Sequence, residues 1–276
     1  VSLSLPGGNF TAIIGESGCG KSVLGQAILN ILPSGVIKKG RVLYNGEQVE
    51  KILSAFGIIP QNPSESLNPV RKIGKQMQDI LAVHNIADSD NSYKKQCLHL
   101  FGLQEAGRVL AAYPHELSGG MLQRVLCAMA VSSKPEWILA DEPTKGLDEQ
   151  VGAVVRKNLL TIKQDLHLSM LIITHDIALA QEVCDDVLVM YAGQVLEHNA
   201  DIWHKPLHPY TKGFLKALPK NGLQVIPGKA LVPGESFTGC KFAARCPYCT
   251  TRCKEEKPAM QQVGNAEVRC FLYAEG

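Results

Sequence analysis

Short apolar runs that end in polar residues or glycine recur along the first two thirds of the chain, with helical patterns between them. Runs of this length without polar alternation are typical of strands in a parallel sheet that is buried on both faces. The runs predicted as strands are residues 10–14, 56–59, 137–140, 170–173 and 187–190.

The segments between these runs predict helices. Apolar residues recur at helical spacing between residues 149 and 165, and residues 177–183 follow a strand in the same way. Both segments are predicted as crossover helices of an α/β fold. From about residue 69 to residue 134 no run resembles a strand, and the pattern is helical at residues 70–83, 93–101 and 121–131. This pattern predicts a helical subdomain, about residues 69–134, inserted into the α/β core.

The pattern changes again near residue 200. Prolines punctuate a region of low periodicity after Glu197, which predicts a linker and an appended tail. We therefore expect one domain over residues 1–200 and a C-terminal extension over residues 201–276. The first six residues alternate like a strand already under way, so we also expect strands upstream of Val1.

Composition and charge exclude a disordered chain and a strongly basic one. The chain has 276 residues, 28 Lys and Arg against 26 Asp and Glu, a net charge of +2, and 45% hydrophobic residues. These values are typical of a folded protein and give no electrostatic footprint for nucleic acid. No apolar run approaches the roughly 18 to 20 residues that a membrane-spanning helix needs.

One glycine-rich loop carries the clearest chemistry. It follows the first predicted strand, opens a helix and reads Gly15-Glu16-Ser17-Gly18-Cys19-Gly20-Lys21-Ser22. This is the G-x-x-x-x-G-K-[ST] motif in the strand, loop and helix context that it requires. Its glycines let backbone N–H groups turn towards phosphate oxygens, and the helix N-terminus adds partial positive charge. We expect Lys21 to reach the β- and γ-phosphates and the Ser22 hydroxyl to bind Mg²⁺.

Two further strand ends carry candidate catalytic side chains. Asp141 and Glu142 follow strand 137–140, at the carboxyl end where open α/β sheets bind their ligands. Asp141 suits Mg²⁺, and Glu142 suits the polarisation of an attacking water. His175 follows strand 170–173. A lone histidine there is more often structural, and only the other two motifs make it a candidate γ-phosphate contact.

A fourth segment precedes the acidic pair and reads Leu117-Ser118-Gly119-Gly120-Met121-Leu122-Gln123-Arg124. It resembles the signature motif of ABC-type ATPases. Gln61 follows strand 56–59, and Asp148 follows the acidic pair. With these residues, the order of motifs over residues 1–200 is similar to that of an ABC nucleotide-binding domain.

The resemblance implies that two such domains pack head to tail, with each ATP between the P-loop of one and the signature of the other. It implies that Gln61 senses Mg²⁺ and water, Glu142 is the catalytic base and His175 holds the γ-phosphate. It places Ser118, Gly119, Gly120 and Met121 against ATP, and Asp148 across the dimer interface. Met121 stands where glutamine is commonest. The aromatic residue that stacks on adenine lies upstream of the P-loop in this family, and so upstream of Val1.

Finer motifs resemble the peptide and nickel importer branch. They are Gln61-Asn62-Pro63, Leu67-Asn68-Pro69-Val70, His208-Pro209-Tyr210-Thr211 and Leu218-Pro219. This implies a peripheral subunit on the cytoplasmic face of the cell membrane, which hydrolyses ATP to energise an importer for peptides, nickel or related small solutes. The implied partners are a second ABC ATPase subunit, identical or paralogous, two transmembrane permease subunits and an extracytoplasmic solute-binding protein. No direct contact with nucleic acid is expected.

Five of the nine cysteines crowd into the tail. Cys240, Cys246, Cys253 and Cys270 occupy positions that hold an iron–sulfur cluster in some members of the family, whereas relatives usually have a small residue at Cys249. Four thiolates suffice for a [4Fe–4S] cluster or for a tetrahedral Zn²⁺, and their spacing does not separate the two. The resemblance favours the cluster, and reduced thiols without metal are a third interpretation.

The expected fold class is therefore α/β, a P-loop NTPase of the ABC type with an inserted helical subdomain and a cysteine-rich C-terminal extension. The alternative function is a soluble ABC-type ATPase that acts on nucleic acid or ribosomes. Such proteins usually hold two cassettes in one chain, whereas this chain has one P-loop. Relatives that act on DNA ends carry a long coiled coil, and no sustained heptads occur between Lys21 and Ser118. A metal-sensing module that only retains an ATP fold predicts the loss of Lys21 or Glu142, and both are present.

Overall fold

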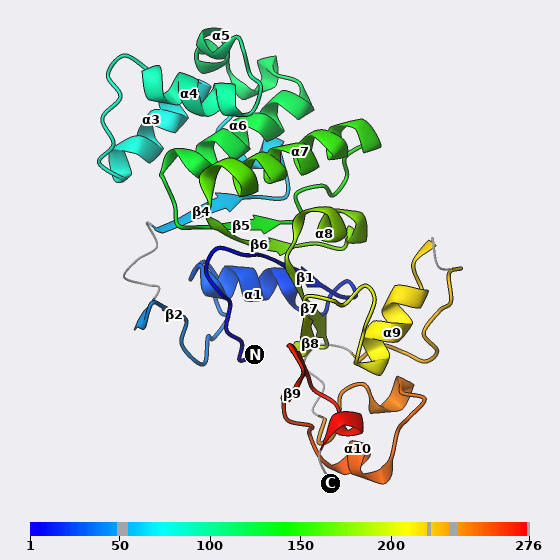
Figure 1. The fold of residues 1–276 in the computed structure, drawn as a ribbon. Coiled ribbons are helices and arrows are strands. Elements are labelled where there is room, and N and C mark those ends of the chain that lie inside the picture. Colours follow the sequence, from blue (N-terminus) through cyan, green and yellow to red (C-terminus); the bar gives the residue numbers. More distant parts are fainter. Residues whose placement is uncertain (49–54, 220–221, 232–236, 275–276) are drawn as a thin grey trace. The chain divides into compact units, whose positions relative to one another are not determined.

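The computed structural model describes residues 1–48, 55–219, 222–231 and 237–274. The chain divides into two compact units. One unit comprises Val1–Pro6, Thr11–Leu24 and Cys184–Gly276, and the other comprises Gly7–Phe10 and Gly25–Val183. Figure 1 gives the order of helices and strands along the chain, coloured from blue to red.

The larger unit is built on three parallel strands in the order β4 (Phe56–Ile59), β5 (Trp137–Asp141) and β6 (Ser169–Ile173). Ile59 pairs with Ala140, and Asp141 pairs with Ile173. The carboxyl ends of the three strands therefore lie at one edge of the sheet. This pairing confirms the predicted parallel strands in this part of the chain. The unit also holds a short hairpin of β2 (Leu43–Tyr44) and β3 (Glu47–Gln48).

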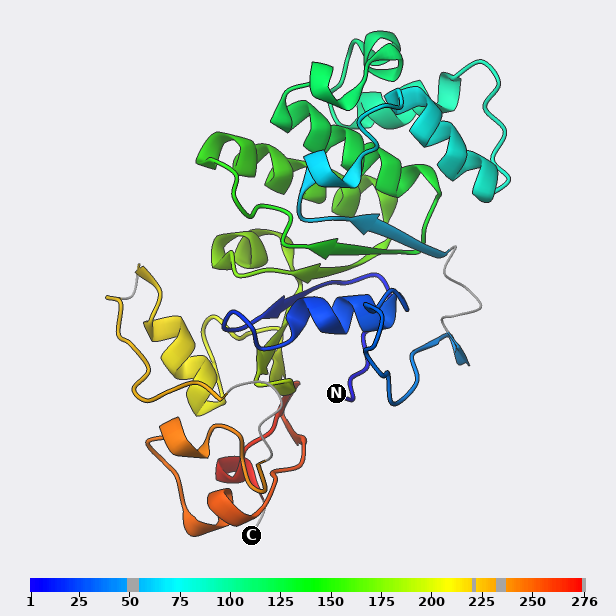
Figure 2. The same ribbon diagram turned by 180° about the vertical axis from the view of Figure 1, so that it is seen from behind.

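Two long helices lie over one face of these strands, as the opposite views of Figures 1 and 2 show. α6 (Gly119–Ser132) is buried on nearly every side after its first turn. α7 (Glu149–Leu166) buries Val155, Leu159 and Ile162, which recur every three or four residues along one face. α8 (Ile177–Val183) follows β6. Both predicted crossover helices are thus confirmed.

The chain between β4 and α6 is helical. It forms α2 (Pro63–Ser66), α3 (Ile73–Val83), α4 (Ser92–Leu100), α5 (Ala106–Ala111) and the 3₁₀ turn η3 (Pro114–Glu116). α3 begins three residues later than the predicted start at Val70. The side chain of Gln76 bonds to the backbone of Asn68 and Arg71, which stabilises a turn there instead.

The smaller unit contains a mixed sheet. β1 (Phe10–Ile14) pairs in parallel with β7 (Asp186–Tyr191), and β7 pairs antiparallel with β8 (Gln194–Asn199). β10 (Ala266–Val268) continues the sheet from β8, and β9 (Gln261–Val263) follows it. The segment predicted as a linker and tail therefore contributes two strands to the sheet that begins at the P-loop strand.

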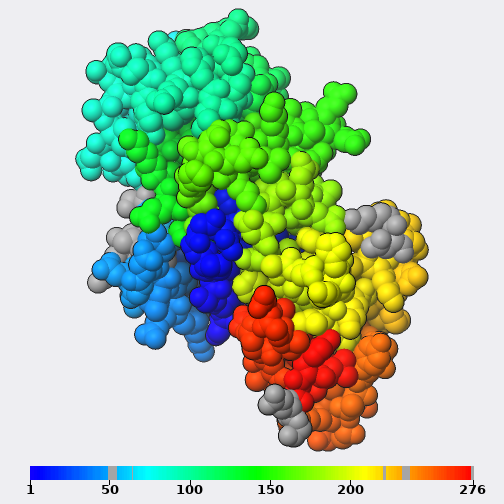
Figure 3. All heavy atoms as spheres, in the orientation of Figure 1, coloured from blue at the N-terminus to red at the C-terminus, as the bar shows by residue number. Residues whose placement is uncertain are grey.

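The C-terminal elements are α9 (Pro209–Lys216), η5 (Ala243–Arg245), α10 (Thr251–Glu255) and η6 (Phe271–Tyr273). An aromatic cluster joins α9 and the N-cap residue of η5 to β7. The Tyr210 ring centroid lies 4.7 Å from that of Tyr191 and 5.4 Å from that of Phe242. In Figure 3 the orange and red C-terminal segments pack against the yellow ones. Among the described residues, no helix combines the length and apolar character needed to cross a bilayer.

Candidate nucleotide site

The path of the glycine-rich loop between β1 and α1 (Lys21–Ile28) depends on its glycines. A Cβ on Gly15 would lie 2.1 Å from the carbonyl oxygen of Met190 on β7. Gly18 and Gly20 have φ angles of 77° and 101°, in the region that glycine adopts without strain. The loop therefore follows the tight path that turns backbone N–H groups towards a bound anion.

Lys21 folds back over this loop. Its ammonium group donates to the carbonyl oxygens of Gly15 at 2.9 Å and Glu16 at 3.2 Å, and the residue is 6% exposed. The cation is thus held inside the loop, where a phosphate oxygen can replace a carbonyl as its partner. Ser22 follows on the first turn of α1 and is half-buried. Ser17 and Gly18, at the tip of the loop, are exposed.

Cys19 supports the loop by packing. It is 5% exposed, and its carbonyl accepts a hydrogen bond from the N–H of Gly193 at 2.8 Å. Burial raises the pKa of the Cys19 thiol, which keeps it protonated and unreactive at neutral pH.

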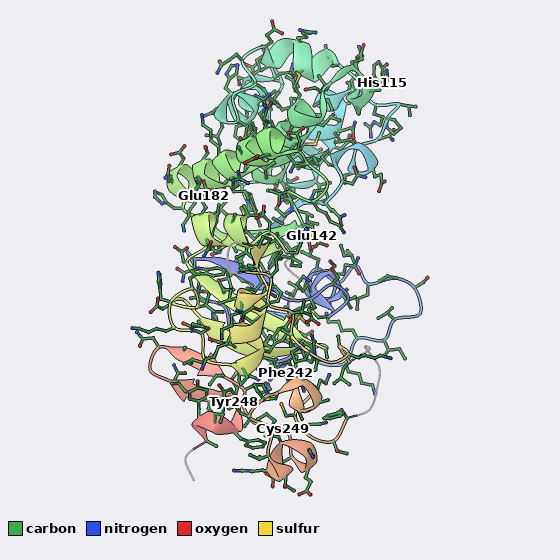
Figure 4. All side chains as sticks on the ribbon, turned by 90° about the vertical axis from the view of Figure 1, so that its right-hand side faces the viewer. His115, Glu142, Glu182, Phe242, Tyr248 and Cys249 are labelled. Atoms are coloured by element: carbon green, nitrogen blue, oxygen red, sulfur yellow. The ribbon has the colours of Figure 1, made fainter. Side chains whose placement is uncertain are left out.

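In the larger unit, the ends of β5 and β6 bring two predicted catalytic residues together. Glu142 is buried with a φ of 48°, and its N–H donates to the carbonyl of Ile173 at 2.7 Å. Its Oε2 lies 2.6 Å from Nδ1 of His175 and accepts the backbone N–H of His175 at 3.3 Å. Asp141, the last residue of β5, is half-buried beside it. Figure 4 labels Glu142 at this edge.

Neighbouring residues complete the same edge. The Thr144 hydroxyl donates to Oδ2 of Asp176 at 3.1 Å, which ties the loop after β5 to the loop after β6. The sequence analysis missed this pair, although each residue lies next to a motif. Gln61 is exposed two residues after β4, so it follows the strand adjacent to β5.

The signature residues open a helix. Ser118 is the N-cap of α6, and its side chain accepts the N–H of Met121 at 3.4 Å. Asp148 caps α7 in the same way, accepting the N–H of Val151 at 2.9 Å. The two helix starts are neighbours, since a Cβ on Gly120 would lie 3.9 Å from Cγ1 of Val151. Ser118, Gly119 and Asp148 are exposed, so both caps are accessible.

Four cysteines of the extension line one cavity. They are Cys240, Cys246, Cys253 and Cys270, and Cys249 is not among its lining residues. Burial raises the pKa of Cys240 to about 11, and negative charge on the other three thiols acts in the same direction. In the described part of the chain, no three His, Cys, Asp or Glu side chains are close enough together to hold a single metal ion. Figure 4 shows Phe242, Tyr248 and Cys249 on this extension.

The structure adds two residues to the P-loop that the sequence analysis missed. The N–H of Glu16 donates to the hydroxyl of Tyr210 at 3.1 Å, and the carboxylate of Glu16 binds Arg245. They lie 194 and 229 residues away along the chain, and no local pattern connects them to the loop.

Comparison with known proteins places this geometry in a family. Residues 1–145 match the ABC transporter family model, and residues 196–253 match the model of the oligopeptide/dipeptide transporter C-terminal region. The chain is 36% identical over 286 residues to the dipeptide transport ATP-binding protein DppD of Escherichia coli (strain K12), covering 96% of this chain and 87% of that protein. It is 35% identical over 299 residues to the oligopeptide transport ATP-binding protein AppD of Bacillus subtilis (strain 168), covering 100% of this chain and 90% of that protein.

A solved structure agrees. That of cbiO1 from Clostridium perfringens, part of the ABC transporter complex cbiONQ, superposes with a TM-score of 0.61 and 27% sequence identity, covering 73% of this chain and 81% of that chain. The chain therefore belongs to the ABC transporter family of ATP-binding, ATP-hydrolysing subunits, in the branch that carries the oligopeptide/dipeptide transporter C-terminal region.

Proposed function

We propose that ATP hydrolysis by this chain drives the import of peptides across a membrane. The observation that carries this proposal is the match of residues 196–253 to the oligopeptide/dipeptide transporter C-terminal region. Relatives named for dipeptide and oligopeptide transport also align over nearly the whole chain. Residues 1–200 act as the ATPase domain with a helical subdomain at about 69–134, and residues 201–276 form the extension.

The P-loop, Gly15 to Ser22, holds the phosphates of ATP in this proposal. Lys21 leaves the carbonyls of Gly15 and Glu16 for phosphate oxygens, which carry full negative charge and are the stronger acceptors. The Ser22 hydroxyl and the Asp141 carboxylate offer the oxygen ligands that Mg²⁺ prefers. When bound, Mg²⁺ neutralises charge on the phosphates.

Glu142 is the general base for the attacking water. Burial and the contact with His175 fix its carboxylate at the strand edge. His175 stays half exposed at its side chain, at 54%, so its other ring nitrogen is available to the γ-phosphate. Gln61, exposed at the same edge, positions water and Mg²⁺.

A second ATPase subunit completes each site. The exposed caps of α6 and α7 present Ser118, Gly119 and Asp148 side by side, and the N-terminus of α6 is a suitable partner for an anion. Gly120 and Met121 continue this first turn. These residues contact the ATP of the partner subunit, and ATP thereby holds the pair together.

A groove in the larger unit is the docking surface for a permease subunit. Apolar side chains line it from β4, α3 and α6, and the ion pair of Arg71 with Asp79 stands beside them. Ile58 on β4 is 43% exposed there. An apolar groove with charged residues beside it suits a short amphipathic helix. We place the chain on the cytoplasmic face of the membrane, bound to two permease subunits and served by an extracytoplasmic solute-binding protein.

The four-cysteine cavity holds a [4Fe–4S] cluster in this proposal. One Zn²⁺ at about 2.3 Å from each sulfur requires four thiolates drawn tightly together. The four described cysteines line one shared cavity of about 190 Å³, and four thiolates are the ligand number of a [4Fe–4S] cluster. Bound metal would also offset the cost of removing the proton from the buried Cys240 thiol.

Metal analysis of anaerobically purified full-length protein tests the cluster. We expect iron and sulfide in the wild type, loss of both in Cys240→Ser, and retention in Cys249→Ser, whose side chain does not line the cavity. Zinc without sulfide, or equal loss in both variants, would reject the cluster.

Co-purification from the native membrane fraction tests the transport function. We expect two multi-span proteins and a second ABC ATPase, and reconstituted complexes should take up labelled dipeptides when ATP is supplied. Ile58→Asp should release the membrane subunits while ATP binding remains, and the matched control Val36→Asp changes an apolar residue of similar exposure outside the groove. Uptake of a nickel chelate without peptide uptake would show that the transported solute is the chelate and not a peptide. Recovery with ribosomes or nucleic acid would reject the transporter.

A further inference from the structure

The second residue of the P-loop introduces negative charge into an anion-binding loop. Glu16 precedes the exposed tip of the loop, and its carbonyl already accepts a hydrogen bond from the Lys21 ammonium. A free carboxylate at this position would repel phosphates and compete with them for Lys21, because charges a few ångströms apart interact strongly in a partly buried site.

Arg245 supplies the opposite charge. Its Nη1 lies 3.0 Å from Oε1 and 3.1 Å from Oε2 of Glu16. The side chains are 7% and 27% exposed, so solvent screens this pair much less than a surface pair.

Other contacts of Arg245 fix its guanidinium group in this position. Nε donates to the carbonyl of Pro227 at 3.2 Å, and Nη2 donates to the carbonyl of Ile226 at 3.3 Å. The group also lies 5.8 Å from the ring centroid of Tyr191 and 6.0 Å from that of Phe242, within the range of cation–π attraction. The arginine is therefore held in place by groups that are independent of the P-loop.

Tyr210 fixes the backbone of the same residue. Its ring is fully buried, and its hydroxyl accepts the N–H of Glu16 at 3.1 Å. Glu16 is thus constrained at its N–H, its carbonyl and its carboxylate, and two of these three constraints come from the C-terminal part of the chain.

We propose that Arg245 is a positioning residue for nucleotide binding, the built-in counterion that keeps the Glu16 carboxylate away from Lys21 and the phosphates. The extension thereby sets the affinity of the P-loop for ATP. This inference rests on the proposed role of Gly15 to Ser22 as the ATP site.

Equilibrium titration of the full-length chain with a fluorescent ATP analogue tests the proposal without turnover. We expect Arg245→Ala to raise the Kd for the analogue about tenfold, because removing one partner leaves the other charge uncompensated. Glu16→Gln in the Arg245→Ala background should recover most of the lost affinity, since it removes the uncompensated charge. Arg108→Ala breaks an exposed Arg–Glu pair in the larger unit and serves as the matched control, with an unchanged Kd.

A second variant keeps the test valid if Arg245→Ala does not fold. Arg245→Gln keeps a hydrogen-bond donor for the carbonyls of Ile226 and Pro227 but loses the charge, and it should show the same rise in Kd and the same rescue by Glu16→Gln. An unchanged Kd in both Arg245 variants overturns the proposal. Equal weakening with and without Glu16→Gln also overturns it, because a purely structural arginine would not be rescued by removing a charge.

Lys21→Ala separates this proposal from the assignment of the ATP site. If Lys21→Ala binds the analogue as tightly as the wild type, the assigned site is wrong. If Lys21→Ala loses binding while the Arg245 variants bind normally, only the counterion role of Arg245 is wrong.

Discussion

Nδ1 of His175 lies 2.6 Å from Oε2 of Glu142, and the backbone N–H of the same histidine donates to that oxygen as well. One carboxylate oxygen of the proposed base is therefore held by the loop after β6. In the proposed mechanism, the other oxygen orients the attacking water molecule. The two residues should act as one unit in catalysis.

Glu142→Gln should abolish hydrolysis and leave ATP binding in place. The amide keeps the size of the side chain and accepts the N–H of His175, but it is not a base. General bases contribute about 10²–10⁴-fold to rate, so turnover should fall by at least about a hundredfold. Gel filtration with ATP should show a trapped dimer. Glu149→Gln, which changes an exposed acid in the first turn of α7, should leave turnover unchanged.

His175→Ala should lower kcat by about tenfold or more, because Glu142 then loses the ring that orients it. Steady-state kinetics on Glu142→Gln, His175→Ala and the double variant checks the coupling. Residues that act together give non-additive losses, so the double variant should lose less than the product of the two single losses. Additive losses would show that the two side chains contribute independently.

His208 predicts sensitivity to acid. It is 1% exposed, its Nδ1 accepts the N–H of Tyr210, and burial lowers its pKa to about 3. The ordinary histidine pKa is about 6.5, so below this pH the unfolded chain binds a proton at His208. The folded chain does not bind that proton until about pH 3, so stability falls as the pH falls from about 6.5 to about 3. The loss from this residue between pH 7 and pH 5 should be about 2 kcal/mol.

Urea unfolding at the two pH values measures this loss. His208→Asn keeps a side-chain acceptor for the cap of α9 and should remove most of the pH dependence. His204→Asn changes an exposed histidine nearby and should leave the wild-type dependence intact. Identical pH dependence in His208→Asn and the wild type would contradict the assignment to His208.

Gly239→Ala should disturb the cysteine cavity. A Cβ there would lie 2.4 Å from the carbonyl oxygen of Cys253 and 2.5 Å from the carbonyl carbon of Lys254. Both are backbone atoms of α10, so the helix must move, at a cost of about 1–3 kcal/mol. Thermal unfolding and iron content measure the effect. Gly107→Ala, with open space around its Cβ in α5, should be neutral or slightly stabilising, and an equal loss there would contradict the steric argument.

The sequence predicted the local chemistry and much of the larger unit. The central apolar runs became strands with bounds close to those expected, because burial on both faces leaves a continuous apolar signal. The P-loop and the acidic pair were equally local. The helix caps at Ser118 and Asp148, which the sequence analysis did not assign, are local as well. Each is specified by residues within a few positions of one another.

The C-terminal region was harder to predict. β9 and β10 are each only three residues long, which is too short for a periodic pattern to stand out from the surrounding loops. The pairing of β10 with β8 depends on hydrogen bonds between residues far apart in the sequence. The pairing of Arg245 with Glu16 has the same origin, since a single arginine in a loop has many possible partners.

The distance along the chain between Glu16 and Arg245 has a consequence for synthesis. The P-loop is translated first, and its counterion is translated 229 residues later. At about 5–20 residues per second, the nascent chain spends on the order of ten to fifty seconds with an unbalanced carboxylate in its phosphate loop. Nucleotide would therefore be a poor folding ligand until Arg245 has been translated, and a chain truncated before the extension would carry a complete motif without a complete site.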